Sequence, residues 1–168
     1  MQQVSSQALI GLATDIATEF DHRHNLAGDI AAVQAEIERD PDHARLFYEN
    51  LALKLHNFYT GCERIFQTIV SEPNGASPSG FDWHRRLLER MGAGWQGRPA
   101  LLSPQSTEDL REYLAFRHVV RNICGFEFDV ERINRLIDRY PAVWSQVDAD
   151  IEGFVAWLHG LAGRLDAA

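Results

Sequence analysis

An apolar stripe between residues 47 and 69 constrains the fold of this chain more than any other feature of its sequence. Its members step along the chain by 4, 4, 3, 4, 3 and 4 residues: Phe47, Leu51, Leu55, Phe58, Cys62, Ile65 and Ile69. Steps of three and four place all of them on one face of an α-helix, whereas a half-buried strand would alternate at a step of two. The stripe therefore predicts a helix that crosses the interior of a helical bundle.

The segments on either side of this helix continue the helical pattern. Apolar residues at steps of three and four predict one long first helix with a bend near Asn25 and Gly28, and Asp40-Pro41 ends it. Beyond the striped helix, residues 74–105 form a loop-rich insertion with a short helix at about 81–91.

The last third of the chain predicts three more helices. One begins at Ser106, whose Ser-Thr-Glu-Asp run is close to a capping box, and ends near Cys124. Asp129 or a neighbour starts another helix, and Pro141 opens the last. Because strand signals are absent, we predict an all-α fold: an antiparallel bundle of about five to six helices in a single domain over residues 1–168.

Composition excludes several classes of protein. Sixteen Lys and Arg against twenty-four Asp and Glu give a formal net charge of −8, which has the wrong sign for a strongly basic nucleic-acid binder, although a local basic site is still allowed. The two cysteines, Cys62 and Cys124, form no CxxC pair, so neither a zinc site nor a disulfide framework is expected. The N-terminus lacks the pattern of a signal peptide and no apolar stretch is long enough to span a membrane, so we expect a cytoplasmic protein.

Two arginines on the predicted helix 106–124 need a physical explanation. At about 100° per residue, Arg117 and Arg121 point into the middle of an apolar arc, and His118 and Asn122 lie on its edge. Arginine is almost never buried without a partner, so one interpretation is that a carboxylate such as Glu63 pairs with them. The other is a cleft where both arginines bind a phosphodiester and His118 transfers a proton, as metal-free RNA cleavage requires.

The same stretch resembles a known family. Residues 116–125, Phe-Arg-His-Val-Val-Arg-Asn followed by two further residues and then Gly, are similar to the motif of HepT-like toxins in the HEPN superfamily, and so are residues 55–66 and 82–88. The resemblance runs from about residue 46 to 150. It implies a homodimer whose motif helices face each other, and a metal-independent endoribonuclease without a cofactor. It also implies an RNA substrate, for which tRNA is one candidate, and a partner of the minimal nucleotidyltransferase antitoxin type.

The family motif carries over only in part. Arg117 matches its Arg, but Asn122 occupies the place of the motif His, and Cys124 that of the Tyr found in many HepT proteins. Asn cannot act as a general acid or base, and Cys124 cannot be the tyrosyl acceptor for adenylylation that the family uses. We therefore predict that Arg117 and Arg121 bind the scissile phosphate, that His118 transfers the proton, and that Asn122 orients the phosphate or the base.

Other residues are weaker candidates for substrate contacts. Tyr59, Cys124 and His84 are predicted to reach the RNA, although for Tyr59 a packed ring with its hydroxyl at a rim is an equal alternative. His22 and His24 point apart on a helix, so we predict no metal site there.

Two further hypotheses stay open beside the ribonuclease. One is a catalytically degenerate module that dimerises and binds a nucleotidyltransferase, a nucleotide or RNA without cleavage, and the other is a purely structural helical adaptor.

Overall fold

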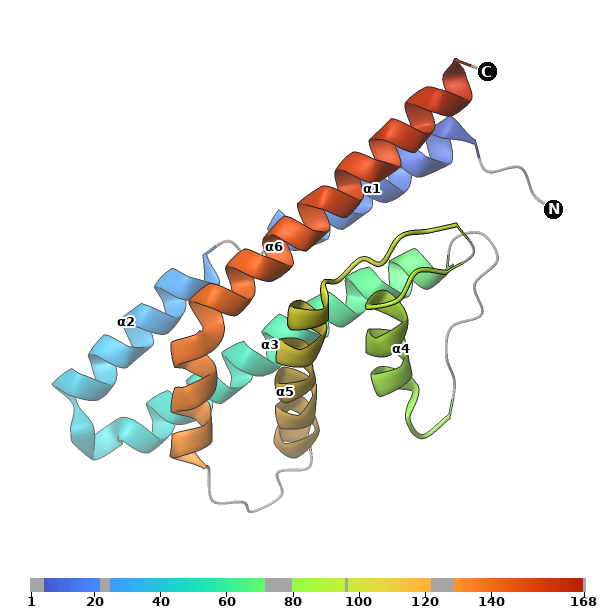
Figure 1. The fold of residues 1–168 in the computed structure, drawn as a ribbon. Helices are drawn as coiled ribbons and strands as arrows, with labels where there is room; N and C mark the ends of the chain where they lie inside the picture. The colour runs from blue at the N-terminus through green and yellow to red at the C-terminus, as the bar shows by residue number, and fades with distance from the viewer. Residues whose placement is uncertain (1–4, 22–24, 72–79, 96, 122–128, 168) are drawn as a thin grey trace.

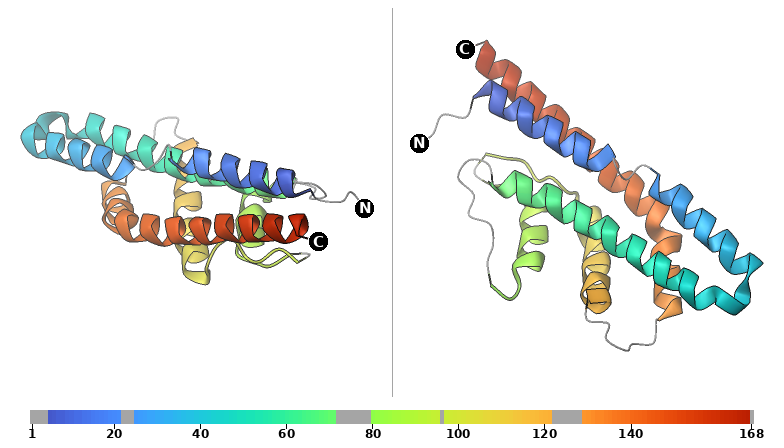
Figure 2. Two further views of the ribbon diagram at one scale, coloured as in Figure 1. Left: turned by 90° about the horizontal axis from the view of Figure 1, so that it is seen from above. Right: turned by 180° about the vertical axis from the view of Figure 1, so that it is seen from behind.

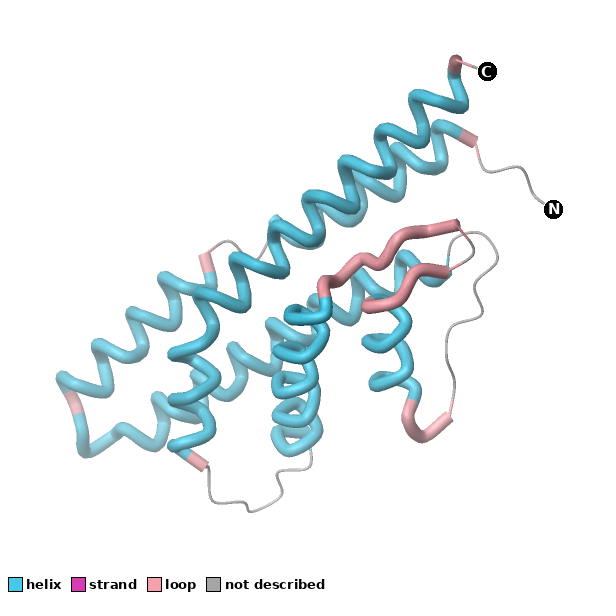
Figure 3. Tube along the Cα trace, viewed as in Figure 1, coloured by secondary structure: helices cyan, strands magenta, loops and turns pink. Residues whose placement is uncertain are grey.

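The described chain is built from helices and loops. The computed structural model describes residues 5–21, 25–71, 80–95, 97–121 and 129–167, and Figures 1 and 3 show helices joined by loops, with no strand in these ranges. The helices are α1 (Ser6–Asp21), α2 (Leu26–Arg39), the short 3-10 turn η1 (Pro41–His43), α3 (Ala44–Ser71), α4 (Trp83–Met91), α5 (Pro104–Arg121) and α6 (Val130–Asp166). The predicted all-α helical bundle is confirmed.

Helix α3 is the central element of the bundle. Its predicted apolar stripe is buried from Leu51 to Ile69, because helices pack against it from both sides. Figures 1 and 2 show α4, α5 and the first part of α6 lying side by side across α3, while α1 runs along the rest of α6. At the centre, the ring of Phe58 lies edge-on to Tyr113 of α5 at 5.2 Å and to Tyr140 of α6 at 5.1 Å between ring centroids. Aromatic packing therefore fixes α5 and α6 against α3.

The predicted single first helix is wrong, because the structure has two helices there. Helix α1 ends at Asp21 and α2 begins at Leu26, after Asn25; residues 22–24, with His22 and His24, lie outside the described residues. Helix α1 packs mainly against α6, whereas α2 packs mainly against α3. Steps of three and four resume after Asn25, which is why the apolar spacing predicted one helix, but the step of six from Phe20 to Leu26 does not keep the apolar face in line.

The predicted boundary at Pro141 is also wrong. Helix α6 runs unbroken through Pro141 for 37 residues. Proline lacks the N–H that would bond to the carbonyl of Ile137 and therefore bends a helix that continues through it. Figure 1 shows this bend, with the first part of α6 directed differently from its long C-terminal part. Buried Tyr140 and Val143 lie on either side of Pro141, so packing sustains the helix across it.

The boundaries of the motif-bearing helix differ partly from the prediction. Helix α5 begins at Pro104 rather than Ser106, since the Oγ of Ser103 accepts the backbone N–H of Ser106 at 3.2 Å and Pro104 fills the first helical position. Its predicted end near Cys124 lies outside the described residues. The predicted start of the next helix is confirmed, because the Asp129 carboxylate accepts the N–H of Arg132 at 2.9 Å.

Candidate functional site

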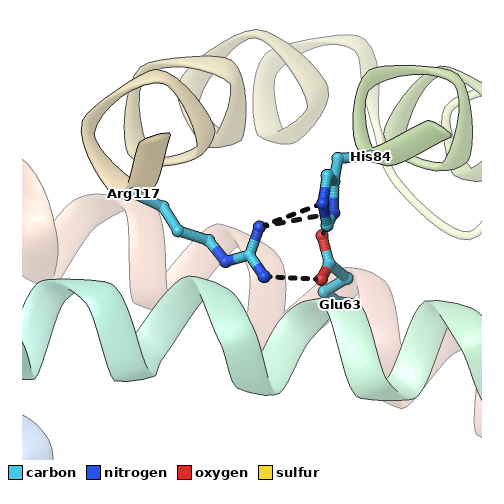
Figure 4. Close-up of polar contacts among 3 residues, drawn as sticks. All are labelled: Glu63, His84 and Arg117. Carbon is cyan, nitrogen blue, oxygen red and sulfur yellow. Dashed lines mark hydrogen bonds and ion pairs between the residues drawn. The ribbon is translucent and has the colours of Figure 1, made fainter. Parts of the chain in front are cut away.

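Three polar side chains from three helices meet in the interior beside the motif stretch. Glu63 comes from α3, His84 from the first turn of α4, and Arg117 from α5 (Figure 4). Their side chains are only 6, 10 and 8 % exposed. Burial of this kind is costly unless the charges are paired. We call these three residues the buried triad.

The triad is held together by a shared carboxylate. One oxygen of Glu63, Oε2, lies 2.5 Å from Nδ1 of His84, and the other, Oε1, lies 3.2 Å from Nη2 of Arg117. Nη1 of Arg117 lies 3.3 Å from Nδ1 and 3.5 Å from Nε2 of His84, and Figure 4 shows the guanidinium beside the imidazole. When Nδ1–H donates to Glu63, the tautomer of His84 is fixed and Nε2 is left as the proton acceptor of the ring.

Arg117 is inward-facing, as the helical wheel predicted, and it pairs with Glu63 as the first of the two interpretations proposed. Its Nε is buried and has no hydrogen-bond partner among the described residues. The charge of the guanidinium is therefore compensated within one chain, by a carboxylate that lies 54 positions away in the sequence. In this arrangement Arg117 contacts Glu63 and His84 beneath the surface. Its role in binding a phosphate stays a prediction.

His118, the next residue on α5, is exposed at the surface, unlike Arg117. Its ring lies edge-on to His84, with 5.5 Å between centroids and 75° between planes. An exposed imidazole thus lies directly beside the buried triad. Arg121 is the last residue of α5, one turn beyond Arg117, and its side chain lies outside the description, as do Asn122 and Cys124.

Tyr59 is placed deeper than the rim position that the sequence allowed. The residue is fully buried, and its hydroxyl has no hydrogen-bond partner in the described part of the chain. Burial raises the pKa of Tyr59 well above its usual value, with the nearby charges of Glu63 and Cys62 adding to the effect. The hydroxyl is therefore a neutral, buried group at neutral pH.

The pairing of His84 with Glu63 is the feature that sequence reasoning missed. His84 was predicted only as a weak RNA contact, and Glu63 only as a partner for an arginine. The two residues lie 21 positions apart on separate helices, so no periodicity connects them. The only signal was the presence of polar residues next to the apolar stripes of two helices.

Other kinds of site were sought in the same residues. No group of three His, Cys, Asp or Glu side chains within the described ranges is arranged to hold a metal ion. A cavity of about 340 Å³ lies between α1 and α6, and none of the predicted site residues lines it. None of the helices described here combines the length and the apolar character needed to cross a membrane.

The described helices and the buried triad define an all-α helical protein with an adjacent Arg-His pair on α5. The family model described as HepT-like protein matches residues 50–158, which is more than half of the chain. The chain therefore belongs to the HepT-like family. The match includes all of α4 and α5, which carry His84, Arg117 and His118. Searches of curated proteins and of solved structures gave no match.

Proposed function

We propose that this HepT-like protein is the toxin of a toxin–antitoxin pair and a metal-independent endoribonuclease. One observation carries the proposal: an exposed imidazole, His118, lies against a second imidazole, His84, that a buried carboxylate holds in place. Metal-free cleavage of RNA needs proton transfer and a cation, and the motif helix supplies candidates for both.

The reaction assigns a different task to each residue. A base removes the proton from the 2′-hydroxyl, O2′ attacks phosphorus, the bond to O5′ breaks, and an acid protonates O5′, which leaves a 2′,3′-cyclic phosphate. His118 is the residue that transfers a proton, because it is the imidazole exposed to a substrate. Arg121 binds the phosphate, and Asn122 orients the phosphate or the base. Glu63, His84 and Arg117 are positioning residues that hold the surface on which His118 lies.

A homodimer would complete this chemistry. One His118 cannot be base and acid in the same cleavage step, whereas two copies of α5 facing each other supply two imidazoles. The HepT-like family membership supports this arrangement, because the family resemblance implies facing motif helices. The antitoxin in this proposal is a minimal nucleotidyltransferase.

The test is cleavage of RNA by purified protein in the presence of EDTA. We expect wild type to cleave total RNA or tRNA and to leave 2′,3′-cyclic phosphate ends, and His118→Ala to lose at least a hundredfold in rate, as loss of general acid–base catalysis typically does. His159→Ala is the matched control, because this exposed histidine lies on α6 beside the α1–α6 cavity. Absence of cleavage by wild type, or equal rates for the two variants, would contradict the proposal.

A second candidate is a HepT-like module that binds a nucleotidyltransferase, a nucleotide or RNA without cutting it. Two observations favour it: Glu63 compensates the charge of Arg117, and Asn122 stands where the family motif has His. This candidate predicts that the product of a neighbouring nucleotidyltransferase gene co-purifies with the protein. It also predicts that overexpression leaves cell growth unchanged, whereas an active toxin would slow growth.

A further inference from the structure

Helix α4 and the segment that follows it carry positive charge in an otherwise acidic chain. Residues 80–103 contain four arginines and two carboxylates, although the whole chain has a formal net charge of −8. Aromatic side chains lie at both ends of the helix: Phe81 is fully exposed before α4, and Trp95 is 49 % exposed after it. Basic residues interleaved with exposed aromatic rings are typical of surfaces that bind single-stranded nucleic acid.

Trp95 is held rigidly in its exposed position. It belongs to the strap, which we define as residues 92–95 and 97–103. Within the strap, the N–H of Trp95 donates to the carbonyl of Arg98 and the N–H of Arg98 donates to the carbonyl of Trp95, both at 2.9 Å. Gly97 has a φ of +87°, a left-handed conformation that favours glycine. The guanidinium carbon of Arg90 lies 4.6 Å from the centroid of the Trp95 ring. The backbone of Trp95 is thus held in a tight turn, and its ring contacts Arg90.

Arg98 fastens the strap to the end of α4. Its guanidinium donates to the carbonyls of Arg90 at 3.0 Å, Ala93 at 3.2 Å and Pro99 at 2.9 Å. Burial lowers the pKa of Arg98, and the neighbouring positive charge of Arg90 lowers it further. Among the described residues, Arg98 has no carboxylate within ion-pair distance. The Arg98 guanidinium is therefore held by backbone carbonyls at the end of α4 that also carries Arg90, and an anion bound there would interact favourably with both positive charges.

The two carboxylates of α4 and its N-terminal flank are engaged elsewhere. Arg85 lies 3.2 Å from Asp82 and 3.7 Å from Glu89, one turn away on either side. These three charges sum to −1, so the net charge of +2 in the segment comes from Arg86, Arg90 and Arg98. Two of these three arginines, Arg90 and Arg98, lie at the C-terminal end of α4, where Arg90 contacts the ring of Trp95.

We propose that the C-terminal end of α4 and the strap bind single-stranded RNA, with a base stacked on Trp95 and a backbone phosphate beside Arg90 and Arg98. This proposal rests on the proposed ribonuclease function and extends its substrate site. Six residues separate His84 from Arg90, a rise of about 9 Å along α4, which roughly three stacked nucleotides at about 3.4 Å each would span. A strand bound here would lead toward the helix that carries His118.

The experiment measures RNA affinity apart from cleavage. A fluorescein-labelled 12-nucleotide RNA with 2′-O-methyl groups lacks the attacking hydroxyl, so anisotropy reports binding alone. We expect Trp95→Ala to weaken binding about tenfold, because it removes the ring on which a base stacks. We expect Arg90→Ala to weaken binding by about the same factor, because it removes a contact to a backbone phosphate. Trp95→Phe keeps an aromatic face and should stay within about threefold of wild type. Arg85→Ala is the matched control, because its charge is already paired.

The outcomes separate this proposal from the ribonuclease proposal. Wild-type affinity in both Trp95→Ala and Arg90→Ala would overturn the RNA surface even if the protein cleaves RNA. Failure of wild type to bind the oligonucleotide would also overturn it. If the two variants lose affinity while wild type cleaves no RNA, the RNA surface is supported and the ribonuclease proposal fails. Circular dichroism of each variant checks that the fold is retained, which the exposure of Trp95 leads us to expect.

Discussion

Replacing Glu63 by Gln tests whether the buried triad holds the fold together around the motif helix. The substitution keeps the shape of the side chain but removes its charge, so Arg117 becomes a buried cation without a counter-charge. Its side chain is only 8 % exposed. Removal of one partner of a buried ion pair typically costs about 3–5 kcal/mol. In a chain of this length, that loss corresponds to a fall in Tm of roughly 6–20 °C.

The assay is reversible unfolding by urea, followed by circular dichroism, for Glu63→Gln, Arg117→Met and the double variant. The double variant buries no unpaired charge from this ion pair. We therefore expect its loss in free energy of unfolding to be smaller than the sum of the two single losses by about 2 kcal/mol or more. Glu89→Gln is the matched control. Its exposed pair with Arg85 has a separation of 3.7 Å and should contribute no more than about 1 kcal/mol.

Two results would refute this reasoning. A loss of less than about 1 kcal/mol in Glu63→Gln would mean that Arg117 finds water or another partner at little cost. Additive losses in the double variant would mean that the two side chains do not interact energetically. Either result would favour the interpretation in which Arg117 is available to bind a phosphate, and an RNA cleavage assay of Arg117→Met would then show a large loss of activity in a folded protein.

Three further predictions concern the tyrosines and one close contact. Tyr59→Phe should leave stability unchanged or slightly higher, because its buried hydroxyl has no hydrogen-bond partner among the described residues. Tyr113→Phe should cost about 1–3 kcal/mol in urea unfolding, since its hydroxyl donates to the carbonyl of Leu136 at 2.7 Å. Burial raises the pKa of both tyrosines, so in an absorbance titration they should ionise at higher pH than exposed tyrosines. The unfolded chain ionises first, so stability should fall as the pH rises above 10, and a flat profile up to pH 12 would contradict this assignment. Gly92→Ala should lower the Tm by several degrees, because the added Cβ would lie 2.5 Å from the Oγ1 of Thr107, and an unchanged Tm would mean that Thr107 moves freely.

The parts of the fold that were predicted correctly are those determined by local pattern. The burial of α3 follows from its apolar spacing, and the start of α6 follows from a single capping residue, Asp129. The errors have a common physical cause, since tertiary packing overrode a local signal. Proline usually marks the start of a helix, but α6 continues through Pro141 because the residues on either side of it are buried in the core.

The candidate site was predictable only where one helix determines it. The inward direction of Arg117 and the exposure of His118 follow from the helical repeat within α5. The pairing of Glu63 with His84 could not be predicted, because it depends on how α4 docks on α3, which no pattern within either helix determines. A charged residue on an apolar helix face indicates that it has a partner. Only the three-dimensional arrangement of the helices identifies all members of the buried triad.

Because α6 bends at Pro141, a small change in the bend angle moves the far end of its long C-terminal arm by a large distance. About 25 residues separate Pro141 from Asp166, which gives an arm of about 38 Å at 1.5 Å per residue. At its tip, the hydroxyl of Ser6 donates to Asp166 at 2.8 Å, so α1 and α6 are joined there. A change of only about 5° in the bend angle would displace that tip by about 3 Å over the length of the arm. Two spectroscopic labels, one on α5 and one at the C-terminal end of α6, would therefore report a small rotation beside the motif helix as a measurable change in distance.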